Sequence, residues 1–389
     1  MAKLGEVCTI VSGSTPKTSV ASYWDGNIKW ITPAELNEDT FYIMDSVRHI
    51  TEEGKEKIGL SYLPTGTVIL SSRAPIGKTA IAGCKMCCNQ GFKNLICSDA
   101  IYNEYLYFFL KSKTDYLNSL GRGATFKEIS KSIVENIEIP LPGVNQQKEI
   151  AEKFKKLEQL ISLRKQQLAK LDELVKARFV EMFGDSVANT KNFPSTTLET
   201  VMIVFPQNGL YKPQTDYVQD DTGIPILRID AFYNGKVTNW NTLKRLICSE
   251  TEIDRYLLRE NDIVINRVNS IEYLGKCAHI VGLKEKTVFE SNMMRFHMDE
   301  KKVNAVYVTE VLCTEDIYRQ ILRRAKKSVN QASINQEDVK SLEILVPPLS
   351  LQNQFAAFVE RVDQQKQTVQ QSLEKLELMK KALMQEYFG

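Results

Sequence analysis

The sequence lacks the features of an exported or membrane-spanning protein. None of its apolar runs approaches the length of a membrane span. The segment Met1–Glu6 has no apolar core of a signal peptide, so we expect a cytoplasmic protein whose eight cysteines stay reduced. The net charge of +2 argues against a globally basic nucleic-acid binder, although it is compatible with a local basic patch.

Motifs for catalysis are also missing. The three histidines form no H-E-x-x-H pattern, and there is no Asn-Pro-Pro-aromatic motif and no glycine-rich cofactor loop after a strand. Cys84 and Cys87 have zinc-like spacing, but no second Cys or His pair follows, which favours structural cysteines. Gly77–Thr79 is similar to the end of a phosphate-binding loop, but Ser72 stands where that loop needs glycine. We therefore expect no catalysis, no metal and no cofactor in the chain alone.

A long helical pattern is present twice, at 145–184 and 350–389. In each copy, apolar or long-stemmed residues step by four and then by three, which is the a/d seam of a coiled coil. Every seam position of the second copy is the first plus 205 (355 − 150 = 205). Asn145 and Ser350 are the expected N-caps. The first seam is Ile150, Phe154, Leu157, Ile161, Arg164, Leu168, Leu171, Val175, Arg178 and Met182, and the second is Phe355, Val359, Val362, Lys366, Val369, Leu373, Leu376, Lys380, Leu383 and Tyr387.

The segment before each helix is repeated as well. Residues 4–142 read as short strands and turns with one helix at 102–117, and residues 196–347 follow the same plan. In both, a β-type run ends in arginine and is followed by an irregular turn and a Gly-Lys pair. The predicted organisation is a first domain at 1–142, a helix at 143–184, a second domain at 185–347 and a helix at 348–389.

This order predicts an α+β fold with two homologous mixed α/β domains separated by two long helices. If the two helices pair, short connections force them to run antiparallel, and we expect them to pair as an antiparallel coiled coil. We therefore expect an approximate two-fold relation between the halves, and two similar heads suit two half-sites on DNA.

A family resemblance rests on the two approaches to the helices. Ile137–Pro142 precedes Gln147, Leu342–Leu349 precedes Gln352, and both halves carry the strand-Arg-turn-Gly-Lys unit. The chain resembles the DNA specificity subunits of type I restriction-modification systems over nearly its whole length. This resemblance implies two target recognition domains that read a bipartite site in double-stranded DNA. It also implies that the paired helices fix the gap and hold two methyltransferase subunits, with restriction subunits joining that core.

Candidate DNA contacts lie at matching places in the two halves. Arg73 and Arg267 end equivalent strands, where an arginine could reach guanine and a surface ion pair is the alternative. Residues 319–327 hold five basic residues and no acid, which favours phosphate contacts over a solvated helix face. The full set of candidates is Arg73, Lys78, Arg122, Lys127, Tyr211, Lys212, Arg228, Arg267, Lys276, Arg323, Arg324, Lys326 and Lys327.

The helices also carry apolar residues that an isolated two-stranded coil would not bury. They are candidates for partner docking or for core against the domains: Leu160, Leu163, Leu174, Leu378, Met379 and Met384. The alternative function is a non-enzymatic coiled-coil adaptor that binds protein partners. Sequence-selective retention on DNA distinguishes it from a DNA reader.

Overall fold

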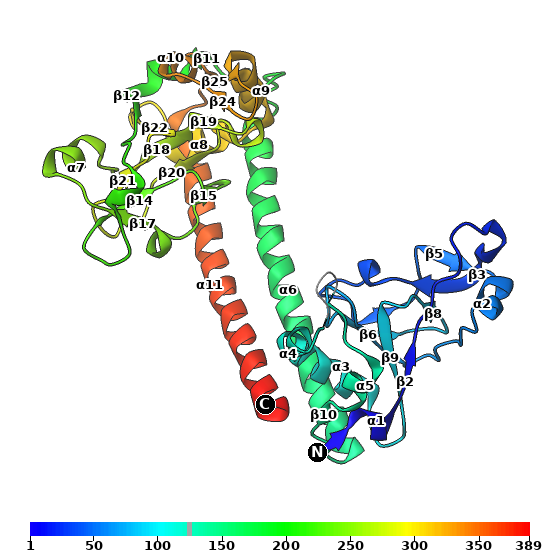
Figure 1. The fold of residues 1–389 in the computed structure, drawn as a ribbon. Coiled ribbons are helices and arrows are strands. Elements are labelled where there is room, and N and C mark those ends of the chain that lie inside the picture. The colour runs from blue at the N-terminus through cyan, green and yellow to red at the C-terminus, as the bar shows by residue number, and fades with distance from the viewer. Residues whose placement is uncertain (123–126) are drawn as a thin grey trace. The chain divides into compact units, whose positions relative to one another are not determined.

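The computed structural model describes residues 1–122 and 127–389, which divide into two compact units. Unit 1 comprises Met1–Gln167 and Val369–Gly389, and unit 2 comprises Leu168–Thr368. Two helices of 40 residues, α6 (Val144–Phe183) and α11 (Leu349–Phe388), each contribute one part to each unit (Figure 1). Each unit therefore consists of a globular domain, the beginning of one long helix and the end of the other.

The globular part of unit 1 contains ten strands and seven short helices or helical turns among its described residues. The strands are β1 (Ala2–Lys3), β2 (Cys8–Ser12), β3 (Trp24–Ile31), β4 (Tyr42–Ile43), β5 (Arg48–Ile50), β6 (Val68–Ser71), β7 (Thr79–Ala82), β8 (Cys87–Cys88), β9 (Phe92–Cys97) and β10 (Glu138–Ile139). The helices are α1 (Leu4–Val7), η1 (Ala21–Tyr23), η2 (Pro33–Glu35), α2 (Glu52–Lys57), α3 (Asn103–Ser112), α4 (Thr114–Ser119) and α5 (Lys131–Glu135).

The globular part of unit 2 follows the same plan with additional short elements. Its strands are β11 (Ser195–Thr197), β12 (Met202–Asn208), β13 (Tyr217–Val218), β14 (Ile224–Leu227), β15 (Phe232–Tyr233), β16 (Gly235–Val237), β17 (Lys244–Leu246), β18 (Asp262–Asn266), β19 (Val268–Asn269), β20 (Cys277–His279), β21 (Val288–Phe289), β22 (Met293–Met298), β23 (Lys326–Lys327), β24 (Ala332–Ser333) and β25 (Glu343–Leu345). Its helices are η3 (Leu198–Val201), η4 (Gln214–Asp216), η5 (Trp240–Thr242), α7 (Glu250–Tyr256), η6 (Ile271–Tyr273), α8 (Ala305–Leu312), α9 (Glu315–Arg324) and α10 (Gln336–Lys340).

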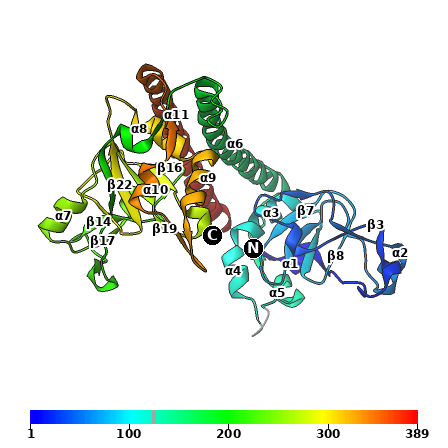
Figure 2. The same cartoon turned by 90° about the horizontal axis from the view of Figure 1, so that it is seen from above.

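The sheets of the two units have the same strand order. The main sheet is β2-β9-β6-β7-β4 in unit 1 and β12-β22-β18-β20-β16-β15 in unit 2. The second sheet is β5-β3-β8 in unit 1, matched by β17-β14-β21 in unit 2, and each closes with a parallel pair. Figure 2 shows α3 beside β7, and α8 covers β20 in the same way. The duplication predicted from the sequence is thus a duplication of topology.

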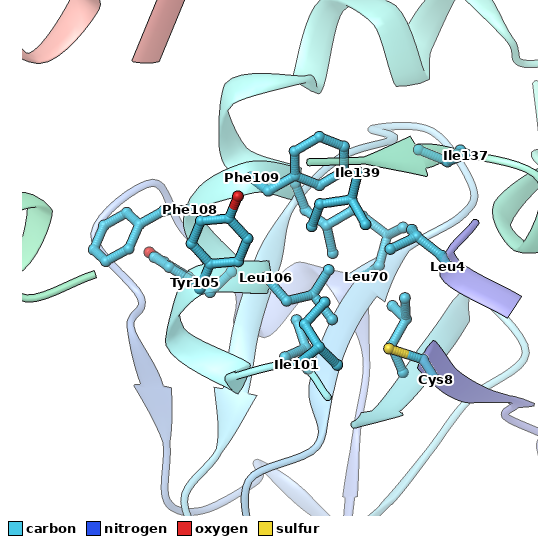
Figure 3. Packing of buried hydrophobic residues seen from close by; sticks show 14 of the residues in the cluster. Leu4, Cys8, Leu70, Ile101, Tyr105, Leu106, Phe108, Phe109, Ile137 and Ile139 are labelled. Carbon is cyan, nitrogen blue, oxygen red and sulfur yellow. The ribbon is translucent and has the colours of Figure 1, made fainter. Parts of the chain in front are cut away.

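Apolar side chains from distant segments form the core of unit 1. Tyr105, Phe108 and Phe109 of α3 belong to one cluster with Leu4 of α1 and Ile139 of β10 (Figure 3). The same cluster takes in Phe154 of α6 and Phe388 of α11, whose rings stack at 5.6 Å between centroids. The two long helices are therefore part of the hydrophobic core of this unit, because their ends supply buried aromatic rings.

The two helices pair antiparallel in each unit. In unit 1, Lys380 Nζ lies 2.6 Å from Glu158 Oε1, and Lys153 Nζ donates to Tyr387 at 3.0 Å. In unit 2, Lys366 pairs with Asp172. Every residue of both predicted seams is buried or half-buried. The predicted antiparallel pairing is confirmed within each unit.

Local details differ from the sequence-based expectations. The helices begin at Val144 and Leu349, so Asn145 and Ser350 lie in the first turn rather than at the N-cap. The carbonyls of the residues before them, Gly143 and Pro348, already accept the first helical hydrogen bonds. The helix predicted at 102–117 is divided into α3 and α4, because Lys113 has φ −102° and ψ 14° and ends the first α-helix. No helix within the described residues is long and apolar enough to cross a membrane.

Candidate nucleic-acid interface

In unit 1, the arginine that follows strand β6 is held by an acidic residue. Arg73 Nε donates to Glu128 Oε2 at 2.9 Å, and Lys93 Nζ lies 3.2 Å from Glu128 Oε1. Burial alone would raise the pKa of Glu128, but the bonds from Arg73 and Lys93 outweigh it and lower that pKa. Glu128 therefore stays charged, and Arg73 has the ion pair that was the alternative to a base contact.

The segment that leads into α5 brings two more cations to this strand end. Arg122 and Glu128 exchange backbone hydrogen bonds of 3.0 Å, and Ile129 donates its backbone N–H to Ser72 at 2.9 Å. The side chains of Arg122 and Lys127 are exposed. The fold thus brings the segment that carries Arg122 and Lys127 to the strand end that carries Arg73, about 50 positions earlier in the sequence.

Unit 2 repeats this arrangement at the end of β18. Ile334 donates its backbone N–H to the carbonyl of Arg267 at 2.9 Å, as Ile129 does to Ser72. The three-stranded sheet β19-β24-β23 begins at that strand end, and its outer strand β23 carries Lys326 and Lys327. Both lysines are exposed, whereas the half-buried guanidinium of Arg267 donates to the carbonyl of Ser291 at 3.2 Å. The exposed positive charge in unit 2 therefore lies on the returning segment rather than on Arg267.

The lysines of the repeated Gly-Lys pair point to backbone carbonyls. Lys78 Nζ donates to Leu36 at 2.6 Å and to Pro33 at 3.2 Å. Lys276 Nζ donates to Ile229 at 2.8 Å and lies 3.7 Å from the ring centroid of Tyr233. Burial lowers the pKa of Lys276. In unit 1 this lysine fixes the loop that follows β3, and in unit 2 it fixes the loop that follows β14.

The remaining candidates in unit 2 divide into exposed and paired residues. Tyr211 is 79% exposed. Lys212 Nζ lies 3.0 Å from Glu252 and 3.4 Å from Asp216, and the bond from Glu252 is the main reason that the pKa of Lys212 is raised. Arg324 makes three hydrogen bonds, to Gln320 and Ser341, whereas Arg323 is exposed.

Arg228 lines a polar cleft of about 370 Å³ formed by the second sheet of unit 2. Lys244 and Arg245 of β17 line the same cleft. These two residues were not among the sequence-based candidates, because no basic pair at a matching place in the first half marks them. Two adjacent basic residues are the signal that the sequence offers here, and such a pair by itself predicts a DNA contact only weakly.

Apolar residues outside the seam are exposed on both helices. Leu174 of unit 2 is 46% exposed. Four residues of unit 1 are between 44% and 68% exposed: Leu160, Leu163, Leu378 and Met379. Met384 is half-buried and packs against the core of unit 1. Met384 is therefore part of the core, whereas the other five side chains are exposed.

The cysteines with zinc-like spacing have other surroundings. Cys84 Sγ lies 3.2 Å from the carbonyl oxygen of Met44, and Cys87 is buried. In the part of the chain that the structure describes, no group of three or more His, Cys, Asp or Glu side chains could hold a metal ion. Burial raises the pKa of Cys87 to about 11, which keeps its thiol protonated near neutral pH.

The family model for the type I restriction modification DNA specificity domain matches residues 1–173 and 202–378. The chain belongs to this family. It is 28% identical over 386 residues to the MjaIX specificity subunit of Methanocaldococcus jannaschii, covering 92% of this chain and 85% of the relative. It is 26% identical over 387 residues to the EcoKI specificity subunit of Escherichia coli K12, covering 94% and 81%.

A solved structure agrees with the fold of this family member. The S subunit of a type I restriction-modification system from M. genitalium matches it with a TM-score of 0.60 at 13% identity, covering 100% of this chain and 95% of that one. DNA target recognition is the function of the family, and its members are the non-catalytic specificity subunits. The partners of this chain are therefore DNA and other subunits of a restriction-modification complex.

Proposed function

We propose that each globular domain reads one half of a bipartite DNA target. The domains are assigned to residues 1–142 and 185–347, and the long helices to residues 143–184 and 348–389. The observation that carries the proposal is the repeated strand end, where a returning segment adds exposed cations in both units. Such cations neutralise phosphates, and a strand end with short loops presents side chains to base edges.

Within each domain the candidate residues have two roles. Exposed residues contact DNA directly, which applies to Arg122 and Lys127 in the first domain. The second domain supplies the exposed residues Tyr211, Arg323, Lys326 and Lys327. The remaining candidates already form bonds within the protein. They hold the loops in shape and contact DNA at the loop edges. They are Arg73, Lys78, Lys212, Arg228, Arg267, Lys276 and Arg324.

The helices serve as a spacer and as a docking surface. Forty residues at 1.5 Å each give a helix of roughly 60 Å, which sets the gap between the half-sites. Exposed Leu174 and Met379 occupy equivalent positions, since 379 − 174 = 205, so two methyltransferase subunits can dock in the same manner. Restriction subunits join this core, and the complex acts on DNA in the cytoplasm.

Exchange of one domain tests the assignment of half-sites. Replacing residues 196–341 with the same region of a relative that has another target should change one half of the selected site. The other half should stay the same, because residues 1–142 are untouched. The sites are selected from random duplex DNA with the assembled methyltransferase. A change in both halves would show that the domains are not independent readers, and a coiled-coil adaptor would select no sequence at all.

A further inference from the structure

A short hairpin in unit 2 extends from the basic segment after α9. Strands β23 and β24 pair antiparallel, with Lys326 opposite Ser333. The turn between them is closed by two bonds to the carbonyl of Gln331, from Ser328 N at 2.8 Å and from Ser328 Oγ at 2.9 Å. In Figure 2 the segment after α9 extends as a narrow projection beyond the sheets of its unit.

The base of this hairpin is fixed to the fold. Strand β24 also pairs with β19, and the side chains of Ala332 and Ile334 are buried. The neighbouring turn η6 is held to α9 by the hydroxyl of Tyr318, which donates to the carbonyl of Ile271 at 3.0 Å. The hairpin therefore has a rigid base from which its turn is presented to solvent.

The side chains of the turn make no contribution to the core. Val329 is 98% exposed, and both Asn330 and Gln331 are exposed. Turns of this kind favour Gly, Asn, Asp or Ser, each for a backbone reason, and a β-branched apolar residue has no such advantage. An exposed valine followed by two amides on a rigid projection is better explained by contact with a ligand than by folding.

The surroundings of the turn indicate a polyanionic ligand. Exposed Arg323 lies in the last turn of α9, exposed Lys326 and Lys327 form β23, and residues 319–327 include no acid. Exposed apolar side chains border the base of the hairpin on the other side, at Ile271 and Tyr273 of η6. Cations that flank apolar and amide side chains are the composition of a surface that holds phosphates and reads bases.

The two-stranded form and the side chains of the hairpin suit the major groove. That groove accepts a two-stranded β-ribbon, in which Asn or Gln pairs with N6 and N7 of adenine and an apolar side chain contacts the 5-methyl group of thymine. We propose that the β23–β24 hairpin enters the major groove and reads an A·T pair in the half-site of the second domain. An amide of Asn330 or Gln331 binds the adenine, and the methyl groups of Val329 pack against the thymine methyl. This assignment rests on the proposed function and adds the element and the base pair.

The test uses the full chain assembled with its modification subunits, and sites selected by the wild-type complex. Replacing thymine by deoxyuridine at the contacted position removes only the methyl group. Wild type should bind the uridine site more weakly, whereas Val329→Ala should bind both sites equally. The double variant Asn330→Ala, Gln331→Ala should lose roughly 5- to 150-fold discrimination at one A·T pair and keep every other preference.

Two controls separate base reading from general effects. Lys326→Ala with Lys327→Ala should weaken binding to all sequences alike and reduce the salt dependence, because phosphate contacts carry no sequence information. Lys284→Ala, an exposed lysine elsewhere in the same unit, should leave affinity and specificity unchanged. All turn residues are exposed, so the variants should unfold at the wild-type temperature.

The outcomes distinguish this inference from the proposed function. If the turn variants keep the wild-type base preferences while the complex still selects a bipartite site, the hairpin does not read bases and only this inference fails. A uniform loss of affinity for all sequences would overturn it as well, since the turn would then touch the backbone alone. If the wild-type complex selects no sequence, the proposed function fails first.

Discussion

At the scale of single residues, one buried glutamine ties each long helix to its own domain. Gln352 accepts a hydrogen bond from the backbone N–H of Asn304 at 2.8 Å and donates to the carbonyl of Pro347 at 2.7 Å. Gln147 makes the same kind of bonds, to Tyr102, Ala100 and Pro142. Backbone groups at the ends of helices have no partner within the helix, so the side-chain amide of the glutamine supplies the missing hydrogen bonds.

The glutamine bonds predict a loss of stability that is specific to one unit. Gln352→Ala leaves a buried N–H and a buried carbonyl without partners and should lower the free energy of unfolding by about 1–3 kcal/mol. Gln147→Ala should do the same for unit 1. Denaturant unfolding followed with hydrogen exchange locates the effect, and the exposed Gln371→Ala serves as the control. Equal stability of Gln352→Ala and Gln371→Ala would contradict this role.

The hydrogen-bond partners of single residues are harder to predict from the sequence than the repeat that contains those residues. The repeated Gly-Lys pair makes Lys78 and Lys276 candidates for DNA contacts, but it does not predict which groups their side chains bond. Their bonds to the carbonyls of Leu36 and Ile229 join residues more than 40 positions apart. No local pattern encodes such a contact, since it depends on how the strands are ordered in the sheet. The partners of Arg73 and Arg324 were hidden for the same reason.

At the scale of elements, the long helices were predictable and the sheets were not. The step of four and three along α6 and α11 is a local signal, and every seam residue lies in the buried part of the helix pair. The strand order of the two main sheets arises from long-range pairing, which the short β-type runs do not specify. Because the domain is duplicated, the order of elements predicted for one half also applies to the other half.

The ends of the long helices complete the cores of domains distant in sequence. Phe388 of α11 lies 5.2 Å from Tyr105 between ring centroids in unit 1, and Phe183 of α6 lies 4.7 Å from Tyr307 in unit 2. Tyr105 and Tyr307 belong to the equivalent helices α3 and α8. Each domain is therefore closed by the helix that follows the other domain.

This closure predicts that Phe388 stabilises unit 1. Its ring is 2% exposed and also stacks on Phe154, so Phe388→Ala should cost about 3–5 kcal/mol through lost burial and a cavity. Amide exchange in α3 should rise, while exchange in α8 should stay at the wild-type level. Tyr116→Ala, at a half-exposed aromatic residue of the same unit, is the matched control. Unchanged protection of α3 in Phe388→Ala would show that the ring is not part of this core.

At the scale of the whole molecule, both helices belong to both units. The boundary between the units falls at Gln167 and Leu168 in α6 and at Thr368 and Val369 in α11. The ion pairs on either side keep one register, because Glu158 and Asp172 are separated by the same 14 residues as Lys380 and Lys366 (172 − 158 = 380 − 366 = 14). A change in helix length therefore leaves the sequence of both domains unchanged.

Helix length should therefore set the gap between the two half-sites. Inserting four residues after Glu173, and four opposite them after Gln365, adds about 6 Å along each helix and close to one turn. Each base pair of DNA rises about 3.4 Å, so the preferred gap should lengthen by one or two base pairs while both half-sites stay the same.

The matched insertion restores the register of the ion pairs, whereas a single insertion shifts one side of the seam and should lower stability. Site selection with the assembled methyltransferase measures the gap for each variant. A seven-residue insertion in both helices is the stricter comparison, because it keeps the heptad phase and should add about three base pairs. A gap that does not change in a folded complex that still selects both half-sites would mean that the separation of the domains is set by something other than the helices.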